Sequence, residues 1–390
     1  MEHRFDNGIL TVNLTGRLDS LSAPAAQNEV NALLDETGAK AIVIDLDGLK
    51  YVASAGLRVF LQLKKRVPEF SVINVPAEIY EVFEMTGFTE IMKVVKAYRR
   101  VPIEVCEVIG RGANGTIYRM TPEIIVKTCS GETALADIAR ERELARRAFV
   151  LGVPTAISFD IVRIGDGYGA AYELLDAKTV AQILRADRNQ MDHCAELMTG
   201  LVKIIHTTSA KAGEMPSARG ALLGYAEYIA GSLDGETARK LVSLVAALPD
   251  ALTMIHGDYH IKNVMVQNGE AILIDMDTLS CGHPVIELGY MYNAYCGFTE
   301  LNEEEGTEFI GLSAGDARAF WRKQLQLYLG TNDEARLTEI ENKARIVGYI
   351  KLLRYVIRCI GIDTEEGRKQ AEYLKNELKT LVNQTESLAW

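Results

Sequence analysis

The hydrophobic and polar positions of the first hundred residues follow two periods in turn. Strict alternation predicts a half-buried strand, and apolar residues three or four positions apart predict one face of a helix. These patterns predict strands at 8–14, 41–46, 70–75 and 92–95, and helices at 24–34, 54–65 and 76–85. Short strands that alternate with helices indicate an α/β domain with its own hydrophobic core.

The pattern changes at a polar, basic segment, residues 96–102, which ends in a proline. Beyond it we predict, in chain order, strands at 103–127, a helix at 132–151, two strands at 161–175, helices at 179–250, a β-rich insert at 254–279 and helices at 301–385. The sequence therefore predicts two domains, at 1–98 and 103–390. The second domain divides into a strand-rich part that ends near residue 175 and a largely helical part at 176–390.

Composition limits the classes of function. The 390 residues carry a formal net charge of −11, and residues 1–100, with 12 basic and 13 acidic side chains, contribute only −1 of it. The remaining −10 argues against general binding to nucleic acid or to an anionic lipid surface, because either requires a basic face. The six cysteines are scattered without a CxxC pair, and the sequence has neither a signal-peptide pattern nor an apolar run of roughly 18 residues. We expect a cytoplasmic protein with reduced thiols and no membrane insertion.

A glycine-rich run, GRGANG at residues 110–115, contains Gly110, Gly112 and Gly115. Such a run opens a dinucleotide-binding βαβ unit, covers phosphates as a β-hairpin, or is a plain turn. A dinucleotide-binding unit requires a helix directly after the run. Here strand-like segments follow within residues 116–127, which argues against that unit and leaves the phosphate-binding hairpin and the plain turn open.

Lys127 ends the second of these strand-like segments. A lysine at the end of a strand is usually solvated, but this one follows the glycine-rich run by one hairpin, where a kinase places the lysine that contacts the α- and β-phosphates. Such a lysine needs a carboxylate partner. In the next helix Glu141 is a lone acid on the apolar face, whereas Glu143 lies toward the solvent side. We therefore predict a pair between Lys127 and Glu141, with Glu143 as the alternative.

The segment IHGDYHIKNVMV, residues 255–266, allows two interpretations. His256, Asp258 and His260 alternate and could together hold a metal ion. Phosphotransfer chemistry instead uses Asp258 to orient and deprotonate an attacking hydroxyl, and Asn263 to hold a magnesium ion. We favour phosphotransfer because it gives Asn263 a role, with His256 as a packing residue that braces the loop.

An apolar strand at 271–274 leads into two acids, Asp275 and Asp277. Acids beyond a strand end are often solvated, but Asp275 follows Asn263 by twelve residues, the spacing of a hairpin whose second strand returns to the same site. We predict that Asp275 binds Mg2+ between the β- and γ-phosphates and that Asp277 lies in the outer shell of the ion.

The order of these motifs resembles the aminoglycoside phosphotransferase and choline kinase branch of the protein-kinase-like fold. The form HGDxHxxN, where protein kinases carry HRDxxxxN, points to this small-molecule branch. The resemblance covers about residues 103–300 and implies a two-lobed kinase fold with ATP in the cleft. It also implies a hinge at 172–175, where the backbone of Glu173 and Leu175 contacts adenine. The family usually has Gly-Asp-Pro and Asp-Leu where this chain has Gly-His-Pro and Glu-Leu, within residues 282–288, a change that affects packing more than catalysis.

Residues 1–95 resemble a STAS domain, the fold of the anti-sigma-factor antagonists. The resemblance rests on the segments GRLD, IDL, YVASAGL and MTGF, at 16–19, 44–46, 51–57 and 85–88. In that family a serine at the start of a helix is phosphorylated by a partner kinase. Ser54 matches its position, although Ala53 stands where aspartate is common. The residues alone favour Ser54 as a helix N-cap, a role compatible with phosphorylation because a phosphate is stabilised at the positive end of a helix.

In the kinase-like family the acceptor site is built by the C-terminal helices and the segment leading into them, which are rich in aromatic residues here. They contain Tyr290, Tyr292, Tyr295, Phe309, Phe320, Trp321 and Tyr328. Aromatic side chains of helices more often belong to the core. The acidic segment 300–305 either attracts a cationic acceptor or is simply solvated.

The expected fold class is α/β (α+β), with a STAS-type α/β sandwich followed by a two-lobed kinase-like domain that has a largely helical C-lobe. We expect an ATP- and Mg2+-dependent phosphotransferase that acts on a hydroxyl of a small molecule, with a cationic acceptor as one candidate. The STAS domain is expected to bind a protein partner or to regulate the enzyme. Two alternatives stay open: a signalling kinase that phosphorylates Ser54 of its own or a partner's STAS domain, and a nucleotide-sensing scaffold.

Overall fold

The computed structural model describes residues 1–102, 106–112, 115–129, 134–165 and 167–390. Some positions of the predicted segments lie outside the described residues. They are 103–105 in the predicted strands at 103–127, 113–114 in the glycine-rich run, 132–133 in the predicted helix and 166 in the predicted strands at 161–175. The chain divides into two compact units, Met1–Val101 and Pro102–Trp390.

The first unit is built from short strands and helices. Its strands are β1 (His3–Asp6), β2 (Ile9–Asn13), β3 (Gly16–Leu18), β4 (Ala41–Asp45), β5 (Leu49–Val52), β6 (Glu69–Val75), β7 (Lys93–Lys96) and β8 (Arg99–Val101). Its helices are α1 (Ala23–Thr37), α2 (Ser54–Arg66), α3 (Ala77–Met85) and α4 (Phe88–Ile91). The main sheet has the order β1-β2-β4-β6-β7, in which β1 is antiparallel to β2 and the other neighbours are parallel.

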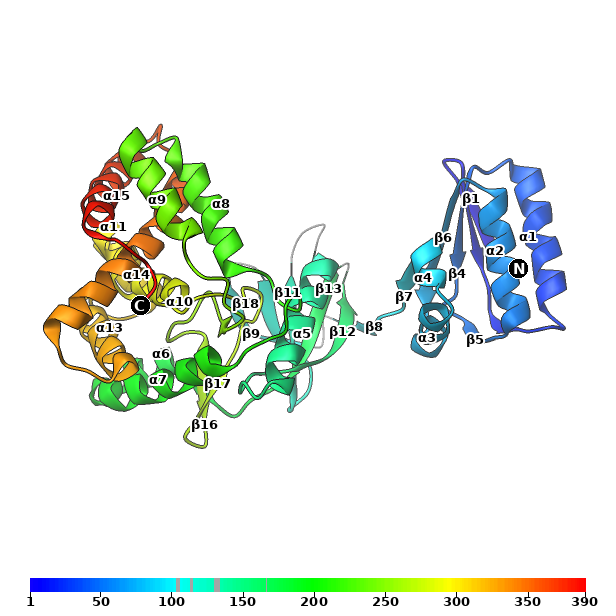
Figure 1. Cartoon of the computed structure of the whole chain (residues 1–390). Coiled ribbons are helices and arrows are strands. Elements are labelled where there is room, and N and C mark those ends of the chain that lie inside the picture. The colour runs from blue at the N-terminus through cyan, green and yellow to red at the C-terminus, as the bar shows by residue number, and fades with distance from the viewer. Residues whose placement is uncertain (103–105, 113–114, 130–133, 166) are drawn as a thin grey trace. The chain divides into compact units, whose positions relative to one another are not determined.

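Alternating burial explains the strands of this unit. In β2 and β4 every second side chain, such as Leu10 and Ile44, is fully buried. Helices α1 and α2 lie side by side, with α1 against β2 and α2 against β6 (Figure 1). They contribute Val30 and Phe60 to the same hydrophobic core. The α/β fold predicted for this part of the chain is confirmed.

The prediction that Ser54 is the N-cap of α2 is wrong. Ser54 is the first helical residue, and the N-cap position belongs to Ala53, whose backbone is extended (φ −106°, ψ 174°). The Ala53 N–H donates to Leu18 O (3.0 Å), and the Ala53 carbonyl accepts from the Leu57 N–H (3.1 Å). Within the described residues no side chain caps this end of α2, and Ser54 is exposed.

The second unit begins with an antiparallel sheet. Its strands are β9 (Glu107–Gly112), β10 (Gly115–Arg119), β11 (Ile124–Cys129), β12 (Ser158–Ile164) and β13 (Gly167–Glu173), in the order β12-β13-β11-β10-β9. Helix α5 (Ala134–Val150) packs against β11, β12 and β13 (Figure 1). Its buried face carries Ile138, Ala145 and Ala148, which recur at helical spacing.

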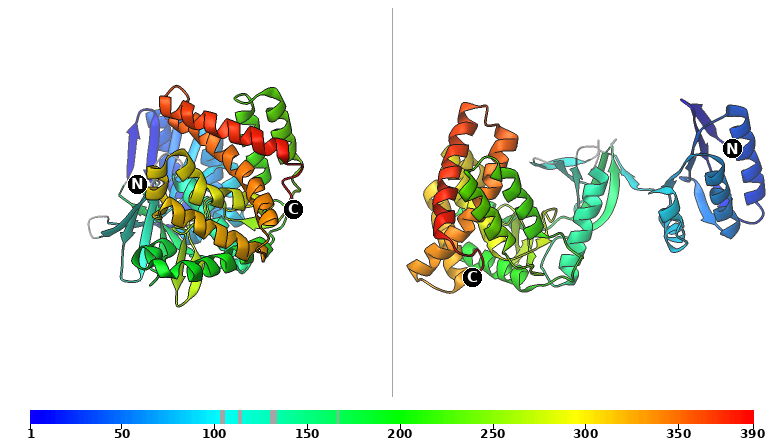
Figure 2. Two further views of the ribbon diagram at one scale, coloured as in Figure 1. Left: turned by 90° about the vertical axis from the view of Figure 1, so that its left-hand side faces the viewer. Right: turned by 45° about the horizontal axis from the view of Figure 1, so that its top comes forward.

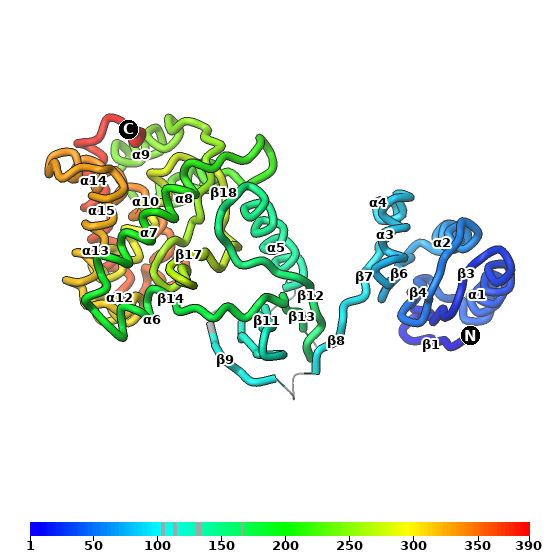
Figure 3. Tube along the Cα trace, turned by 90° about the horizontal axis from the view of Figure 1, so that it is seen from below, coloured from blue at the N-terminus to red at the C-terminus, as the bar shows by residue number. Residues whose placement is uncertain are grey.

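From β13 the chain passes through β14 (Lys178–Thr179) into a helical region (Figure 3). The helices are α6 (Val180–Ala186), α7 (Met191–Thr207), α8 (Ala218–Ala230), α9 (Gly235–Ala246), α10 (Val285–Tyr292), α11 (Phe298–Leu301), α12 (Glu303–Ile310), α13 (Ala314–Leu329), α14 (Glu334–Tyr355) and α15 (Glu365–Gln384). A short 3₁₀ turn, η2 (Arg188–Gln190), precedes α7, and the π-helical segments η3 (Asn293–Gly297) and η4 (Val356–Ile360) follow α10 and α14. The long helix α14 is central, because α8, α10 and α15 all pack against it (Figure 2).

A β-rich insert separates α9 from α10, as the sequence predicts. It contains β15 (Met254–Ile255), β16 (Val264–Gln267), β17 (Glu270–Leu273) and β18 (Ser280–Cys281). The hairpin β16-β17 pairs with β14, and β15 pairs with β18. Helix α7 packs against β15 and β17 and holds the insert on the helical core. The loops after β15 and β17 are thereby brought next to each other.

The described helices include none that is both long enough and apolar enough to cross a membrane.

Candidate active site

Lys127 stands at the centre of an ion-pair cluster. It lies on β11, and its Nζ donates to Glu141 Oε1 on α5 (3.1 Å) and to Asp275 Oδ1 beyond β17 (2.6 Å). The Tyr172 hydroxyl on β13 also donates to Glu141 Oε1 (3.4 Å). Burial alone would lower the pKa of Lys127, but the two carboxylates outweigh this effect and raise that pKa above its usual value. Lys127 is therefore a positioned cation.

The two candidate partners of Lys127 have different surroundings on α5. Glu141 is 7% exposed and lies against the sheet. Glu143 instead binds Arg146 (2.9 Å) and Arg147 (2.6 Å), and these arginines lower the pKa of Glu143 to about 2. Glu141 is thus the partner of Lys127, and Glu143 lies outside the cluster.

The glycine-rich run forms a hairpin. Strands β9 and β10 are antiparallel, and Gly112 pairs with Gly115 while Gly110 pairs with Ile117. A strand follows the run rather than a helix, so the dinucleotide-binding unit is ruled out for this segment. A Cβ at Gly115 would lie 1.7 Å from Thr128 O, so glycine is required where the hairpin approaches β11.

The predicted hinge follows this sheet. Glu173 is the last residue of β13, and the Leu174 N–H donates to Glu123 O (2.7 Å) in the turn before β11. Leu175 lies between β13 and β14, the segment that connects the sheet to the helices.

The loop after β15 brings Asp258 and Asn263 together. Asn263 Nδ2 donates to Asp258 O (3.0 Å) and to Asp258 Oδ2 (3.1 Å), and His260 Nε2 lies 3.4 Å from the same Oδ2. Burial would raise the pKa of Asp258, but His260, Lys351 and His256 hold it well below its usual value. Asp258 is therefore an ionised carboxylate with a restrained direction.

Asp275 and Asp277 lie just beyond β17 and next to that loop, because the Ile274 N–H donates to Asn263 O (3.0 Å). Asp275 adopts a left-handed backbone conformation (φ +64°), which is uncommon for a residue with a side chain and often marks a functional site. Burial, followed by the Asp275 carboxylate, raises the pKa of Asp277 to about 6. The loop therefore gathers acidic groups opposite Lys127.

Glu287 packs behind the loop that follows β15. It lies on α10, is fully buried, and accepts the backbone N–H groups of His256 and Gly257 (3.0 Å for Gly257). Gly257 has a φ of +85°, and a Cβ there would lie 2.8 Å from Thr278 O, so this turn requires glycine. His256 Nε2 lies 3.2 Å from Ile274 O. These contacts agree with the bracing role predicted for His256 and with a packing role for Glu287 of the Glu-Leu pair.

Lys351, on α14, was not among the residues predicted from the sequence. Its Nζ donates to Gly257 O (3.2 Å) and lies 3.9 Å from the ring centre of Tyr290. Burial lowers the pKa of Lys351, although the carboxylates of Asp258, Glu287 and Asp277 act in the opposite direction. The sequence does contain a signal for it, because Lys351 is a lone charge in the apolar run IVGYIKLL, residues 346–353.

Two family models match the chain. One, described as the STAS domain, matches residues 1–101, and the other, described as the phosphotransferase enzyme family, matches residues 105–321, more than half of the chain. The chain belongs to the phosphotransferase enzyme family. Its first unit is a STAS domain, and both resemblances inferred from the motifs are confirmed.

Individual relatives are similar to parts of this phosphotransferase. A putative anti-sigma factor antagonist of Bordetella bronchiseptica, BtrV, is 35% identical over 95 residues, which are 23% of this chain and 81% of that protein. The ADP-bound aminoglycoside phosphotransferase APH(2'')-Ib is 15% identical with a TM-score of 0.46, over 80% of this chain and 99% of that one. A choline/ethanolamine kinase family protein from Mesorhizobium loti is 14% identical with a TM-score of 0.45, over 71% and 87%.

The alternative metal site at His256, Asp258 and His260 is not supported. No group of three or more His, Cys, Asp or Glu residues able to hold a metal ion occurs in the described part of the phosphotransferase. The His256 ring is occupied by the backbone of its own loop, since its Nδ1 accepts from the Asp258 N–H (3.3 Å) and its Nε2 faces Ile274 O.

The oxygen groups near Lys127 do fit a magnesium ion. Asn263 commits its Nδ2 to Asp258, and its Oδ1 accepts no hydrogen bond from any described residue. The carboxylates of Asp275 and Asp277 lie in the adjacent loop. Carboxylate and amide oxygens are the protein ligands that Mg2+ prefers, and such sites are usually completed by water and substrate phosphates.

Most aromatic candidates for an acceptor site belong to the core instead. The fully buried ones are Tyr292, Tyr295, Phe320 and Trp321. Glu300 of the acidic segment is also used internally, because its carboxylate accepts from the Tyr349 hydroxyl (2.6 Å) and pairs with Arg318 (2.8 Å). Phe309 differs from these residues, since its ring centre lies 5.3 Å from that of His260, in the loop that follows β15.

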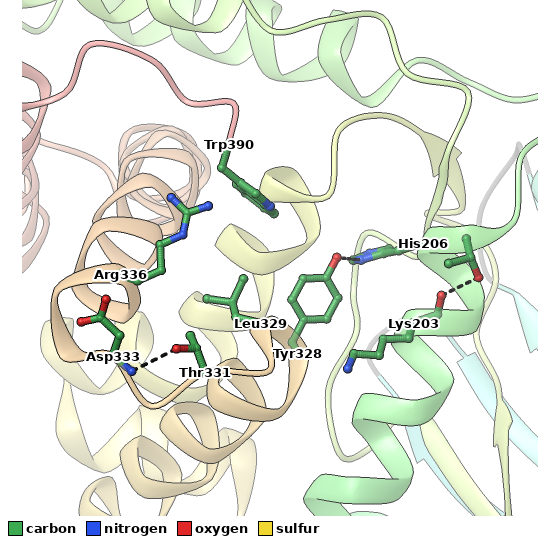
Figure 4. A pocket seen from close by; sticks show the side chains of 9 residues that line it. Lys203, His206, Tyr328, Leu329, Thr331, Asp333, Arg336 and Trp390 are labelled. Carbon is green, nitrogen blue, oxygen red and sulfur yellow. Dashed lines mark hydrogen bonds between the residues drawn. The ribbon is translucent and has the colours of Figure 1, made fainter.

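A cavity of about 630 Å³ is lined by residues of α7, α13 and α14, of the segment between α13 and α14, and by Trp390 (Figure 4). Its described lining includes Tyr328, one of the aromatic candidates for the acceptor site, but none of the predicted catalytic, nucleotide-binding or metal-binding residues. Tyr328, in its wall, bonds through its hydroxyl to His206 Nδ1 (2.7 Å). His206 Nε2 lies 4.0 Å from Glu287 Oε2. Burial lowers the pKa of His206 to about 3, so the ring is neutral and serves as packing between this cavity and Glu287.

Proposed function

We propose that this phosphotransferase moves the γ-phosphoryl group of ATP to a hydroxyl group of a small molecule, with Mg2+ at Asn263 and Asp275. The observation that carries the proposal is the convergence of separate segments on one site. The ion pairs of Lys127 join β11, α5 and the loop after β17, and the Ile274–Asn263 hydrogen bond joins that loop to Asp258.

The residues divide the work as follows. The acceptor hydroxyl donates to a carboxylate oxygen of Asp258, and the acceptor oxygen attacks the γ-phosphorus. The bond from the γ-phosphorus to the oxygen that bridges it to the β-phosphate breaks, ADP leaves with the electron pair, and the hydroxyl proton ends on Asp258. Because the pKa of Asp258 is low, this carboxylate orients the hydroxyl and accepts its proton late. Lys127, held by Glu141, binds the α- and β-phosphates. Asn263 and Asp275 would hold a Mg2+ ion, which would supply positive charge to the β- and γ-phosphates.

The adenine end of the nucleotide is assigned to the hinge. Backbone groups of Glu173 and Leu175 bind the base, and the hairpin with Gly110, Gly112 and Gly115 covers the phosphates, where the lack of side chains lets its backbone approach closely. The STAS domain supplies a surface for a protein partner.

A screen of acceptors tests the proposal. With ATP and Mg2+ the wild-type protein is expected to release ADP slowly alone and faster with one class among amino alcohols, aminoglycosides and sugars, as measured by a coupled ADP assay. Chelation of Mg2+ by EDTA is expected to reduce this release to background, because Asn263 and Asp275 then lack the ion that joins them to the phosphates. Failure of the protein to bind ATP in calorimetry, or release that persists in EDTA, would contradict the proposal.

Phosphorylation of Ser54 is a second candidate function. The observation that favours it is the exposed Ser54 hydroxyl in the first turn of α2, where no described cap bond uses it. A phosphate there would be stabilised by the helix dipole. If this function operates, intact-mass spectrometry after incubation with ATP and Mg2+ will show one phosphoryl group on wild type and on Ser20→Ala, an exposed serine of the same domain, and none on Ser54→Ala. An unmodified wild type, or equal uptake by Ser54→Ala, rejects it.

A further inference from the structure

A hydrogen bond between two helices lies behind the loop that carries Asp258. Tyr328, next to the last residue of α13, bonds through its hydroxyl to Nδ1 of His206, in the last turn of α7 (2.7 Å; Figure 4). The two rings meet edge-on, with their centres 5.4 Å apart. Lys203, one turn before His206, donates to Leu327 O (2.7 Å) and fixes the backbone of α13 beside this contact. The position of the Tyr328 hydroxyl is therefore set by both helices.

The other nitrogen of the His206 ring, Nε2, faces Glu287 on α10. It lies 4.0 Å from Glu287 Oε2, and it has no hydrogen-bond partner among the described residues. The two side chains are 3% and 0% exposed. Both oxygens of Glu287 accept the Gly257 N–H (3.0 and 3.3 Å), and Oε2 also accepts the His256 N–H. Neither oxygen donates to a described residue, which is the pattern of an ionised carboxylate. His206 therefore lies beside a buried negative charge.

The position of the proton on the His206 ring follows from these two neighbours. Burial lowers the pKa of His206 to about 3, so the neutral ring carries one proton. With that proton on Nδ1, the lone pair of Nε2 would face the Glu287 carboxylate in a buried place, which is repulsive. With the proton on Nε2, the N–H dipole points toward the carboxylate, and Nδ1 needs a donor. Among the described residues only Tyr328 bonds to this ring, and the hydrogen bond at one nitrogen decides which nitrogen is protonated.

We propose that Tyr328 is a positioning residue for the loop that carries Asp258. Its hydroxyl donates to His206 Nδ1 and holds the ring proton on Nε2, and this N–H stabilises the Glu287 carboxylate. Burial raises the pKa of Glu287, so each N–H group that faces the carboxylate helps to keep it ionised and able to hold the loop. Tyr328 acts through His206 rather than on a reacting atom. The inference rests on the proposed function, because the loop in question carries the proton acceptor of that reaction.

The tautomer of His206 tests the first step directly. In protein with isotope-labelled histidine, proton–nitrogen correlations across two bonds show which ring nitrogen is protonated, and a His206→Gln sample identifies the signals of His206. Wild type is expected to carry the proton on Nε2. In Tyr328→Phe, which keeps the ring and removes only the hydroxyl, the form protonated on Nδ1 is expected to appear. Tyr228→Phe, at an exposed position on α8, is the matched control and should leave the signals of His206 as in wild type.

Two further measurements follow the effect to the loop. Hydrogen exchange of the His256 and Gly257 N–H groups is expected to be about tenfold faster in Tyr328→Phe, because a less stabilised carboxylate holds them more weakly, while exchange in α15 stays as in wild type. With ATP and Mg2+, kcat is expected to fall about tenfold and the KM for ATP to stay unchanged, because displacement of a reacting group slows transfer without altering the nucleotide site. Tyr228→Phe should change none of these values.

A double variant shows whether Tyr328 acts through His206. The amide of His206→Gln cannot move its protons between two ring nitrogens, so the addition of Tyr328→Phe is expected to lower kcat no further. Because His206 is buried, His206→Gln may not be the only evidence required, and the tautomer and exchange of Tyr328→Phe test the proposal if His206→Gln fails to fold.

The proposal is overturned if wild type carries the His206 proton on Nδ1, or if Tyr328→Phe leaves either the tautomer or the exchange of the loop unchanged. It is also overturned if Tyr328→Phe lowers kcat equally with and without His206→Gln. Failure of the proposed function gives a different result. A tautomer and a loop exchange that depend on Tyr328, in a protein that transfers no phosphoryl group, would support the positioning and count against the reaction. Phosphoryl transfer with a normal kcat in Tyr328→Phe would support the reaction and overturn the role of Tyr328.

Discussion

Asp258→Asn is expected to lower the kcat for phosphoryl transfer by about 10²–10⁴-fold, the usual contribution of a positioned acid or base. An amide cannot accept the proton of the acceptor hydroxyl, and its NH2 group would face the Asn263 Nδ2 that now donates to Asp258 Oδ2. ATP binding is expected to change little, because the Lys127 cluster is left in place. ADP release with the best acceptor measures the first effect, and calorimetric titration with ATP and Mg2+ measures the second.

Asp275→Ala is the comparison for this variant. It removes both the carboxylate bound to Lys127 and a ligand of the proposed magnesium site, so it is expected to weaken ATP binding as well as transfer. Full phosphoryl transfer by Asp258→Asn would show that the assignment of Asp258 is wrong. If wild type binds ATP without transferring phosphate, and Asp258→Asn still responds to ATP in its interaction with a STAS partner, the nucleotide-sensing scaffold becomes the better account.

The fold could be predicted wherever a local pattern was long enough to be recognised. The alternation in β2 and β4 and the apolar face of α5 extend over enough residues to show their period. Strands β3 and β5, with three and four residues, are too short to show one. The N-cap of α2 was assigned wrongly because its position depends on a tertiary contact, the hydrogen bond from Ala53 to Leu18 O, which a local pattern does not contain.

In the candidate site, too, contacts within one short segment could be predicted from the sequence and contacts between distant segments could not. Asp258 and Asn263 lie five residues apart in one loop, so their contact is visible as a spacing. Lys351 contacts Gly257 across 94 positions of the chain. It also lies on a helix with buried residues on several sides, so its signal in the sequence, a lone charge in an apolar run, does not indicate which loop it contacts. The sequence motifs therefore revealed Asp258 and Asn263, but they did not reveal Lys351 on α14.

The two backbone polar groups of Gly257 are each bound by an ionisable side chain. The Glu287 carboxylate accepts its N–H, and the Lys351 ammonium donates to its carbonyl oxygen (3.2 Å). Gly257 directly precedes Asp258, and its left-handed conformation is needed for this turn. The two side chains come from α10 and α14, which pack against each other, so the helical core sets the position of Asp258.

Lys351→Met is expected to lower kcat about a hundredfold, equivalent to about 2.7 kcal/mol of transition-state stabilisation. Methionine has a similar length, but it cannot donate to Gly257 O and carries no charge near Asp258. The loss of that charge raises the pKa of Asp258, because the ammonium favours the ionised carboxylate. Asp258 must be ionised to accept a proton. The acid limb of the pH profile, where activity falls as Asp258 is protonated, is therefore expected to lie at a higher pH in Lys351→Met than in wild type. The measurement is the pH profile of kcat, from which the acid limb is read.

Lys351→Arg separates positioning from packing. It retains the charge, so it is expected to restore the acid limb toward that of wild type even if its larger head group leaves kcat below normal. Lys369→Met, at an exposed position on α15, controls for the loss of one positive charge and should leave both kcat and its pH profile unchanged. Lys351 would be limited to a packing role if the acid limb of Lys351→Met lies at the same pH as in wild type. The same conclusion would follow if kcat falls equally in Lys351→Met and Lys351→Arg. If the acid limb shifts in Lys351→Met and returns in Lys351→Arg, the positive charge of Lys351 is the group from α14 that positions the loop of Asp258 and favours the ionised carboxylate.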